Sequence, residues 1–224
     1  MNNKLLFFGL FLVLLIIVVT VIASDKPENT TDTVATKDDT IKNEKSSQNN
    51  NLKVDHHLNE AVIEKNGDSM TANLKALGLI PLKGESGAVG YGLITDKGTD
   101  AIIVSTTHGG VLDSETQDDA NDPIWHNHIV KLGSVPQCGE NPGVIDITFE
   151  EPGDVKINNT ELAITDAPAV FSGTHSLTKE KLNFIPGTNL QKVVQFELEP
   201  IFGSDSNLQA VCVKNIEEVS FKSL

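Results

Sequence analysis

Two histidines stand two positions apart at the head of an apolar segment, within the sequence NDPIWHNHIVKLG of residues 121–133. Side chains alternate faces along a β-strand, so His126 and His128 would share one face with Val130 and Leu132. Two imidazoles placed in this way can bind the same metal ion. The alternative interpretation is that both are ordinary polar residues at the mouth of a strand.

A third histidine, His108, ends the preceding strand-like segment, and residues 109–125 connect it to the pair. If the two segments form an antiparallel hairpin, the end of the first lies beside the start of the second, which brings His108 close to His126. His175 is a fourth candidate that only the tertiary fold could bring near. These four histidines are the candidate metal ligands, and imidazole ligands with an open position suit zinc or copper.

The connecting loop is acidic and reads DSETQDDANDP over residues 113–123. Asp113, Glu115 and Asp122 are candidates for a general acid or base beside a metal, but the sequence assigns this role to none of them. A calcium site would also use carboxylate oxygens, yet the ligand spacing and central glycine of an EF-hand are missing. A solvated acidic loop is the favoured interpretation.

The histidine pair resembles the metal-binding motif of the cupins, which carry His-x-His on the inward face of a barrel strand and a later histidine that completes the site. His126, His128 and His175 match that order over about 50 residues. The resemblance implies a barrel-type, metal-dependent enzyme that uses these three ligands. The sequence departs from the family pattern because residues 129–132 read IVKL and contain no glutamate, the preceding glycine is out of place, and His108 has no counterpart.

The elements that must position these histidines are β-strands. Short segments rich in β-branched residues alternate with Gly, Pro, Asn and Asp, and no series of helices separates them. This pattern predicts an all-β, antiparallel sandwich or barrel of seven to eight short strands. The predicted strands are residues 87–95, 100–106, 126–132, 143–149, 153–157, 161–165, 191–202 and 208–214. Helix-forming residues between Ser69 and Gly78 predict one short helix over 70–77.

The chain begins with an apolar segment over residues 5–23, long enough to cross a bilayer as a helix. It is interpreted either as an uncleaved signal-anchor or as a cleaved signal peptide. Residues 24–59 are polar and predict a disordered stalk. Residues 60–224 then form one extracytoplasmic domain, which the first segment delivers to or holds at a membrane.

The net charge is −14, and all 17 basic residues are lysines. This balance argues against nucleic acid as a partner, because phosphate recognition needs a basic patch and often uses arginine. The two cysteines, Cys138 and Cys212, lie in a part of the chain expected outside the cytoplasm, where a disulfide is favoured over two free thiols.

Three functions remain open at this point. The first is an exported or membrane-anchored domain that binds a ligand or partner, with a transition-metal site built from the histidines. The second is a metal-dependent enzyme that uses the same histidines. The third is a structural or adhesive surface domain, for which the stalk would serve as a spacer.

Overall fold

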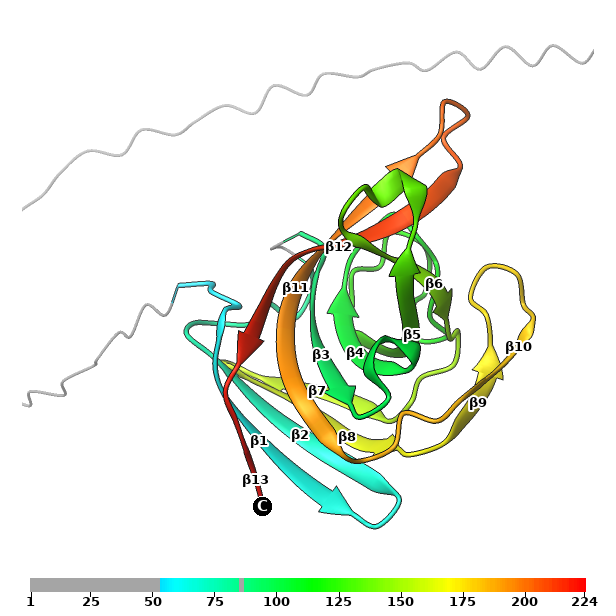
Figure 1. Ribbon diagram of the computed structural model, residues 1–224. Coiled ribbons are helices and arrows are strands. Elements are labelled where there is room, and N and C mark those ends of the chain that lie inside the picture. Colours follow the sequence, from blue (N-terminus) through cyan, green and yellow to red (C-terminus); the bar gives the residue numbers. More distant parts are fainter. Residues whose placement is uncertain (1–52, 85–86) are drawn as a thin grey trace, which may run out of the picture. The chain divides into compact units, whose positions relative to one another are not determined.

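The structure is a computed structural model that describes residues 53–84 and 87–224 (Figure 1). These residues form thirteen β-strands and two short 3₁₀ helices. In chain order they are β1 Leu58–Asn66, β2 Ser69–Ala76, β3 Val89–Thr95, η1 Gly98–Asp100, β4 Ile102–Thr107, β5 His126–Ser134, η2 Pro136–Cys138, β6 Pro142–Ile147, β7 Asp154–Asn158, β8 Glu161–Pro168, β9 Phe171–Thr174, β10 Lys181–Phe184, β11 Leu190–Phe202, β12 Leu208–Val219 and β13 Phe221–Ser223.

The predicted apolar segment and most of the predicted stalk lie outside the described residues. Within residues 53–84 and 87–224, no helix is long and apolar enough to cross a membrane.

Six of the strands close into a barrel in the order β11, β12, β6, β5, β4 and β3 (Figure 1). A five-stranded sheet, β13-β1-β2-β8-β7, and the two-stranded β9-β10 pair complete the fold. All strand pairs are antiparallel except β1 with β13. The all-β prediction is therefore confirmed, and each of the eight predicted segments contains a strand. The predicted number of seven to eight strands is wrong, because β1, β2, β9, β10 and β13 are additional strands. Strands β9, β10 and β13 have only three or four residues, which is too short for an alternating pattern to show in the sequence.

The barrel strands contribute side chains to two separate hydrophobic cores, because successive side chains along a strand point to opposite faces. On β4, Ile103 belongs to a core that the barrel shares with β1, β2 and β8 of the five-stranded sheet. Its neighbours Ile102 and Val104 belong to a second core, together with Val194 and Phe196 of β11. The wall between β3 and β5 thus separates an inter-sheet core from a barrel interior.

The predicted helix over residues 70–77 is wrong, because this segment is strand β2. Met70, Ala72 and Leu74 are buried while the residues between them are more exposed, which is the period of a strand. The segment contains good helix formers, but β2 pairs with β1 on one side and β8 on the other. Tertiary pairing here overrides local helix propensity.

Cys138 and Cys212 form a disulfide, as predicted, with their Cα atoms 5.4 Å apart. It lies where the barrel closes, since Cys212 and Gly143 are the one pair of residues in register between β12 and β6. A side chain at Gly143 would come within 2.5 Å of Val135 and 3.1 Å of Cys138 Sγ, so this close approach requires glycine. The disulfide is consistent with an oxidising, extracytoplasmic location.

Candidate metal centre

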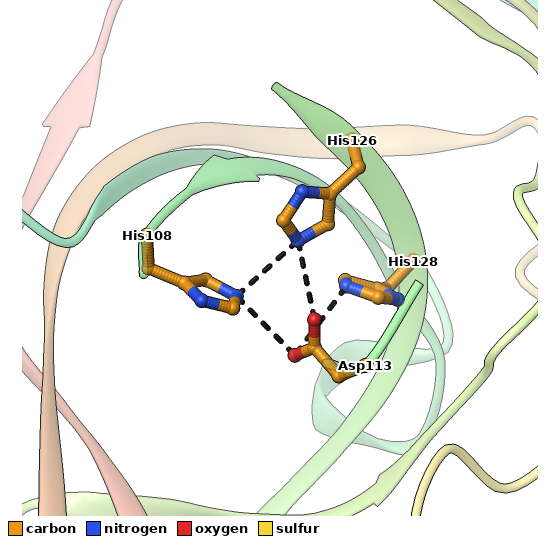
Figure 2. Close-up of side chains that lie close together, drawn as sticks. All are labelled: His108, Asp113, His126 and His128. Atoms are coloured by element: carbon orange, nitrogen blue, oxygen red, sulfur yellow. Dashed lines mark hydrogen bonds and ion pairs between the residues drawn. The ribbon is translucent and has the colours of Figure 1, made fainter. Parts of the chain in front are cut away.

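Four buried side chains converge at the barrel wall: His108, Asp113, His126 and His128 (Figure 2). Each offers one ligand atom, and these four atoms all lie within 4.8 Å of one another. The Nε2 atoms of His108 and His126 are 3.2 Å apart. The Asp113 carboxylate lies 3.2 Å from His108 Nε2, 3.5 Å from His126 Nε2 and 3.8 Å from His128 Nε2. This group could bind a metal ion.

The hairpin of β4 and β5 positions the three histidines. The two strands pair antiparallel with Thr106 opposite His126 and Val104 opposite His128, so both histidines share the inward face of β5. His108 follows β4 directly and therefore lies beside His126, as the hairpin argument predicts. The pairing of neighbouring strands is sufficient to gather these three side chains.

Hydrogen bonds to the backbone set the orientation of two of the rings. His126 Nδ1 lies 2.9 Å from the Ile124 carbonyl oxygen, and His128 Nδ1 lies 2.7 Å from the Thr148 carbonyl oxygen. A carbonyl oxygen can only accept, so each Nδ1 must carry the proton and donate it. In the neutral rings the Nε2 lone pairs are then directed toward Asp113. Ligand histidines in metalloproteins are commonly oriented by such bonds from their second nitrogen.

This arrangement places lone pairs against a carboxylate and therefore requires a cation. His128 Nε2 and Asp113 Oδ1 are buried, and neither has a hydrogen-bond partner among the described residues. Buried polar atoms are rarely left without partners, because this costs free energy. Either protons or a metal ion would satisfy these atoms, and a metal ion can contact all four side chains at once.

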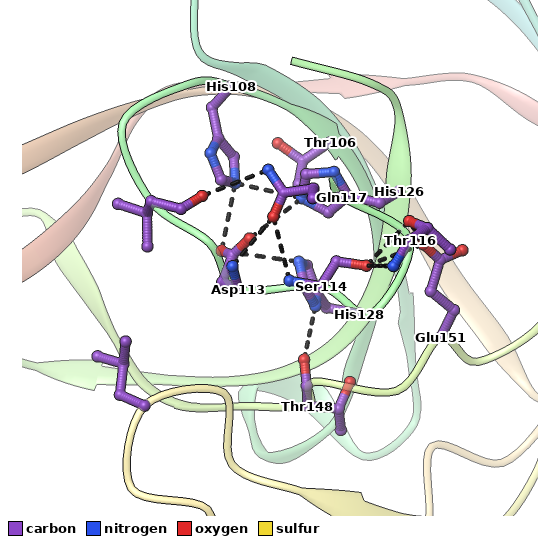
Figure 3. A network of polar contacts seen from close by, with 12 residues as sticks. Thr106, His108, Asp113, Ser114, Thr116, Gln117, His126, His128, Thr148 and Glu151 are labelled. Carbon is purple, nitrogen blue, oxygen red and sulfur yellow. Dashed lines mark hydrogen bonds and ion pairs between the residues drawn. The ribbon is translucent and has the colours of Figure 1, made fainter. Parts of the chain in front are cut away.

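Asp113 reaches the histidines because Gln117 holds the loop that carries it (Figure 3). Gln117 Oε1 accepts from the backbone N–H groups of Asp113 at 3.0 Å and Ser114 at 3.1 Å. Its Nε2 donates to the carbonyl oxygens of Val111 at 3.3 Å and Asp122 at 3.1 Å. One buried amide therefore connects four points of the loop.

A second contact ties the same loop to the segment that follows β6. Ser114 Oγ donates to Glu151 Oε1 at 2.9 Å, and the Thr116 hydroxyl contacts the same oxygen. Glu115, also on the loop, accepts a hydrogen bond from the Glu151 backbone N–H at 3.1 Å. The first part of the acidic loop is thus an ordered support for Asp113, whereas Asp118 and Asp119 are exposed.

Burial and charge affect the two kinds of ligand differently. Burial disfavours the imidazolium form and lowers the pKa of His128 to about 4, against the pull of the nearby Asp113 charge. Burial alone would raise the pKa of Asp113, but the neighbouring His108, His126 and His128 side chains hold it well below its usual range. At neutral pH the group therefore offers a neutral imidazole and a carboxylate, which are the ligand forms.

The site opens onto a cavity of about 340 Å³ inside the barrel. His108, Asp113 and His128 line its wall, while His126 does not. The rest of the lining is mostly aliphatic and comes from the inward faces of the barrel strands. A metal ion held by the four side chains would therefore have an apolar chamber beside it.

Of the four predicted histidine ligands, the structure brings three together. His175 lines the same cavity but lies outside the four-residue group, and its Nδ1 accepts from the backbone N–H groups of Leu177 and Thr178. The sequence indicates Asp113 only as one of three loop carboxylates for acid or base catalysis. The ligand order that the cupin resemblance implies is thus not the grouping found, since His108 and Asp113 join the pair in place of His175.

Asp113 gives no sequence signal as a ligand beyond its position in the loop between the histidines. Its selection over Glu115 and Asp122 depends on how residues 109–125 fold against the barrel.

Comparison of the chain with protein-family models, with curated proteins and with solved structures found no match.

Proposed function

We propose that this chain is an extracytoplasmic metalloprotein whose β-barrel binds one transition-metal ion through His108, Asp113, His126 and His128. A single observation carries the proposal: two buried imidazoles, each fixed by a bond from Nδ1 to a backbone carbonyl, direct Nε2 at a buried carboxylate. A third imidazole joins them through His108. A cation at the common focus of these atoms satisfies all four side chains.

The ligand set favours a first-row transition metal over a hard cation. Calcium and magnesium take shells of oxygen ligands, whereas three imidazole nitrogens with one carboxylate oxygen suit zinc, copper and related divalent ions. Zinc accepts this set, because it binds nitrogen and oxygen ligands and can expand from four to five ligands when a further molecule binds. Zinc or copper is therefore the proposed ion.

The proposed location outside the cytoplasm rests on two features. The Cys138–Cys212 disulfide is favoured in oxidising compartments. The apolar segment of residues 5–23 would deliver the chain across a membrane, either as a retained anchor or as a cleaved signal, with the polar segment after it as a tether. The acidic charge and the lack of arginine disfavour nucleic acid as a partner.

Metal analysis of the full chain tests the site, with purification in mild detergent and without chelator or a polyhistidine tag. We expect about one zinc or copper ion per chain. The His126→Asn/His128→Asn double variant is the sharpest change, because each asparagine amide can still donate to the Ile124 or Thr148 carbonyl while the inward ligand nitrogen is removed.

The matched control is His175→Asn, which retains a local acceptor for the Leu177 and Thr178 N–H groups. We expect the double variant to lose stoichiometric metal binding with its β-rich circular dichroism intact, and the control to bind metal normally. Unchanged metal stoichiometry in the double variant would remove the site. A chain that never binds metal would instead favour a structural or adhesive role.

A metal-dependent enzyme is the second candidate, and the cavity favours it. Catalytic metal sites need access for a second molecule beside the protein ligands, and His108, Asp113 and His128 all face the chamber. Among the described residues that line the chamber, Asp113 is the one carboxylate, and it would exchange a proton there only by giving up a place beside the metal.

A further inference from the structure

The barrel interior holds more space than its side chains fill. Its cavity of about 340 Å³ lies at the lower end of the roughly 300–1,000 Å³ typical of ligand pockets. Val104, Val130, Val194 and Phe196 are buried side chains of this interior that line the cavity. Empty apolar volume reduces stability, because the lining atoms lose contacts. A chamber of this size is a candidate binding site for a small molecule.

The lining determines which charge such a molecule can carry. Among the described residues that line the cavity there is no lysine, and Asp113 is the one acidic residue. An anion buried there would have no cationic side chain to offset its desolvation. The Asp113 charge already faces three imidazoles. Away from the metal, which would itself attract an anionic group, the chamber therefore disfavours charged groups and favours apolar ones.

The position of the cluster determines where the molecule meets polar groups. In register along the hairpin, Val104 lies opposite His128 and Ile102 lies opposite Val130, so the aliphatic lining continues directly from the histidines. A molecule in the chamber would have apolar surface on most sides and the His108, Asp113 and His128 side chains at one wall. One coordinating polar end on an otherwise apolar body fits this distribution.

We propose that the chamber binds a small, uncharged and largely apolar molecule whose polar end reaches the metal site. This inference rests on the proposed function, because the metal supplies the polar contact. It also deepens that function, since it defines the class of molecule on which a metal-dependent reaction in this barrel would act. A long polymer, or a molecule that carries a charge on the part away from the metal, does not fit the chamber.

Cobalt(II) replaces zinc as a visible reporter, and its absorption spectrum changes when an added ligand binds. The full chain loaded with cobalt(II) is titrated with imidazole, 4-phenylimidazole and 4-(imidazol-4-yl)benzoate. The first is the coordinating end alone, the second adds an apolar ring, and the third places a negative charge at the far end of that ring. The series therefore separates the metal from the chamber.

We expect 4-phenylimidazole to bind roughly 10- to 100-fold more tightly than imidazole, because the phenyl ring leaves water for an apolar wall. The benzoate should lose most of this gain. Val130→Phe, which fills the chamber next to His128, should retain cobalt and lose the preference for the phenyl compound. Val170→Phe is the matched control on an exposed side chain and should change neither property.

The outcomes distinguish the two proposals. If cobalt is not bound, the metal site fails and the chamber proposal falls with it. If cobalt is bound but the phenyl compound binds no more tightly than imidazole, or the benzoate binds most tightly, the chamber proposal is overturned and the metal site stands. An unchanged phenyl preference in Val130→Phe overturns it as well. Should that variant not fold, the three-ligand series on the natural chain decides.

Discussion

The two faces of the barrel wall form interiors of opposite character. On the outer face, Tyr91 and Trp125 stack with ring centroids 5.4 Å apart, and both polar atoms are satisfied, by the His56 and Pro81 carbonyl oxygens respectively. On the inner face lie the cavity and the four ligand-type side chains at its wall. Buried polar atoms without a hydrogen-bond partner occur on both faces, Ser105 Oγ and Asn127 Oδ1 on the outer face and His128 Nε2 on the inner one, so the cavity and the clustering of ligand atoms are what distinguish the inner face. The filled core stabilises the fold, whereas the incompletely filled one costs stability and is the place where a ligand would bind.

The largest expected difference between the two interiors is in the cost of a truncated side chain. Ile103 and Ile102 are adjacent on β4, with Ile103 in the inter-sheet core and Ile102 in the barrel interior. We expect Ile103→Ala to lower the free energy of unfolding by up to about 5 kcal/mol and Ile102→Ala by about 2 kcal/mol, since the latter enlarges an existing cavity that can relax. Urea denaturation measures both. Equal costs would contradict the contrast between the two cores.

The next effect concerns the wall of the barrel. The Cys138–Cys212 bond spans 74 residues and lies at the seam between β6 and β12. We expect Cys138→Ser/Cys212→Ser to lower the free energy of unfolding by roughly 4 kcal/mol, through the added entropy of the unfolded chain. Amides that exchange by global unfolding should lose protection equally in all strands, whereas local opening at the seam should add a further loss in β6 and β12 that is missing from β1, β2 and β8. Loss of protection with no excess in β6 and β12 would show that the two regions are not separate.

A third effect is the acid sensitivity of the barrel interior. In the metal-free protein the pKa of His128 is about 4, against 6.5 for an unperturbed histidine. Between these values the unfolded chain binds a proton that the folded chain does not, so the free energy of unfolding falls as pH decreases from 6.5 to 4, by up to about 3 kcal/mol. Denaturation at stepped pH values measures this slope. His128→Asn should flatten it, and an unchanged slope would assign the acid sensitivity to other groups.

The smallest expected effect tests the loop that brings Asp113 to the histidines. The hydrogen bonds of Gln117 go to backbone groups of the loop and not to any candidate ligand side chain. We expect Gln117→Ala to weaken zinc binding about 10-fold, because Asp113 loses its fixed position, with zinc stoichiometry unchanged. Competition with a zinc chelator measures the affinity. Asp118→Ala, on an exposed side chain of the same loop, is the control and should bind zinc as the natural chain does.

Much of the fold follows from local sequence patterns. Alternating β-branched segments predict a strand in each of the eight segments, and an antiparallel hairpin of the two segments joined by residues 109–125 is the arrangement that would bring His108 to His126. The even cysteine count and the expected compartment predicted the disulfide. These features could be read from the sequence because strand alternation, hairpin pairing and cysteine chemistry depend on neighbouring residues or on composition.

Other features depended on contacts between distant segments. The local sequence of β2 favours a helix, and its pairing with β1 and β8 makes it a strand. The choice between a sandwich and a barrel depended on the pairing of β12 with β6. The ligand set was decided in the same way. Asp113 lies beside the histidines because Gln117 holds the loop of residues 109–125 and Ser114 bonds to Glu151, 37 positions further along the chain. His175 lies outside the group. The sequence alone therefore determined which histidines could meet, whereas only the tertiary structure decided which carboxylate meets them.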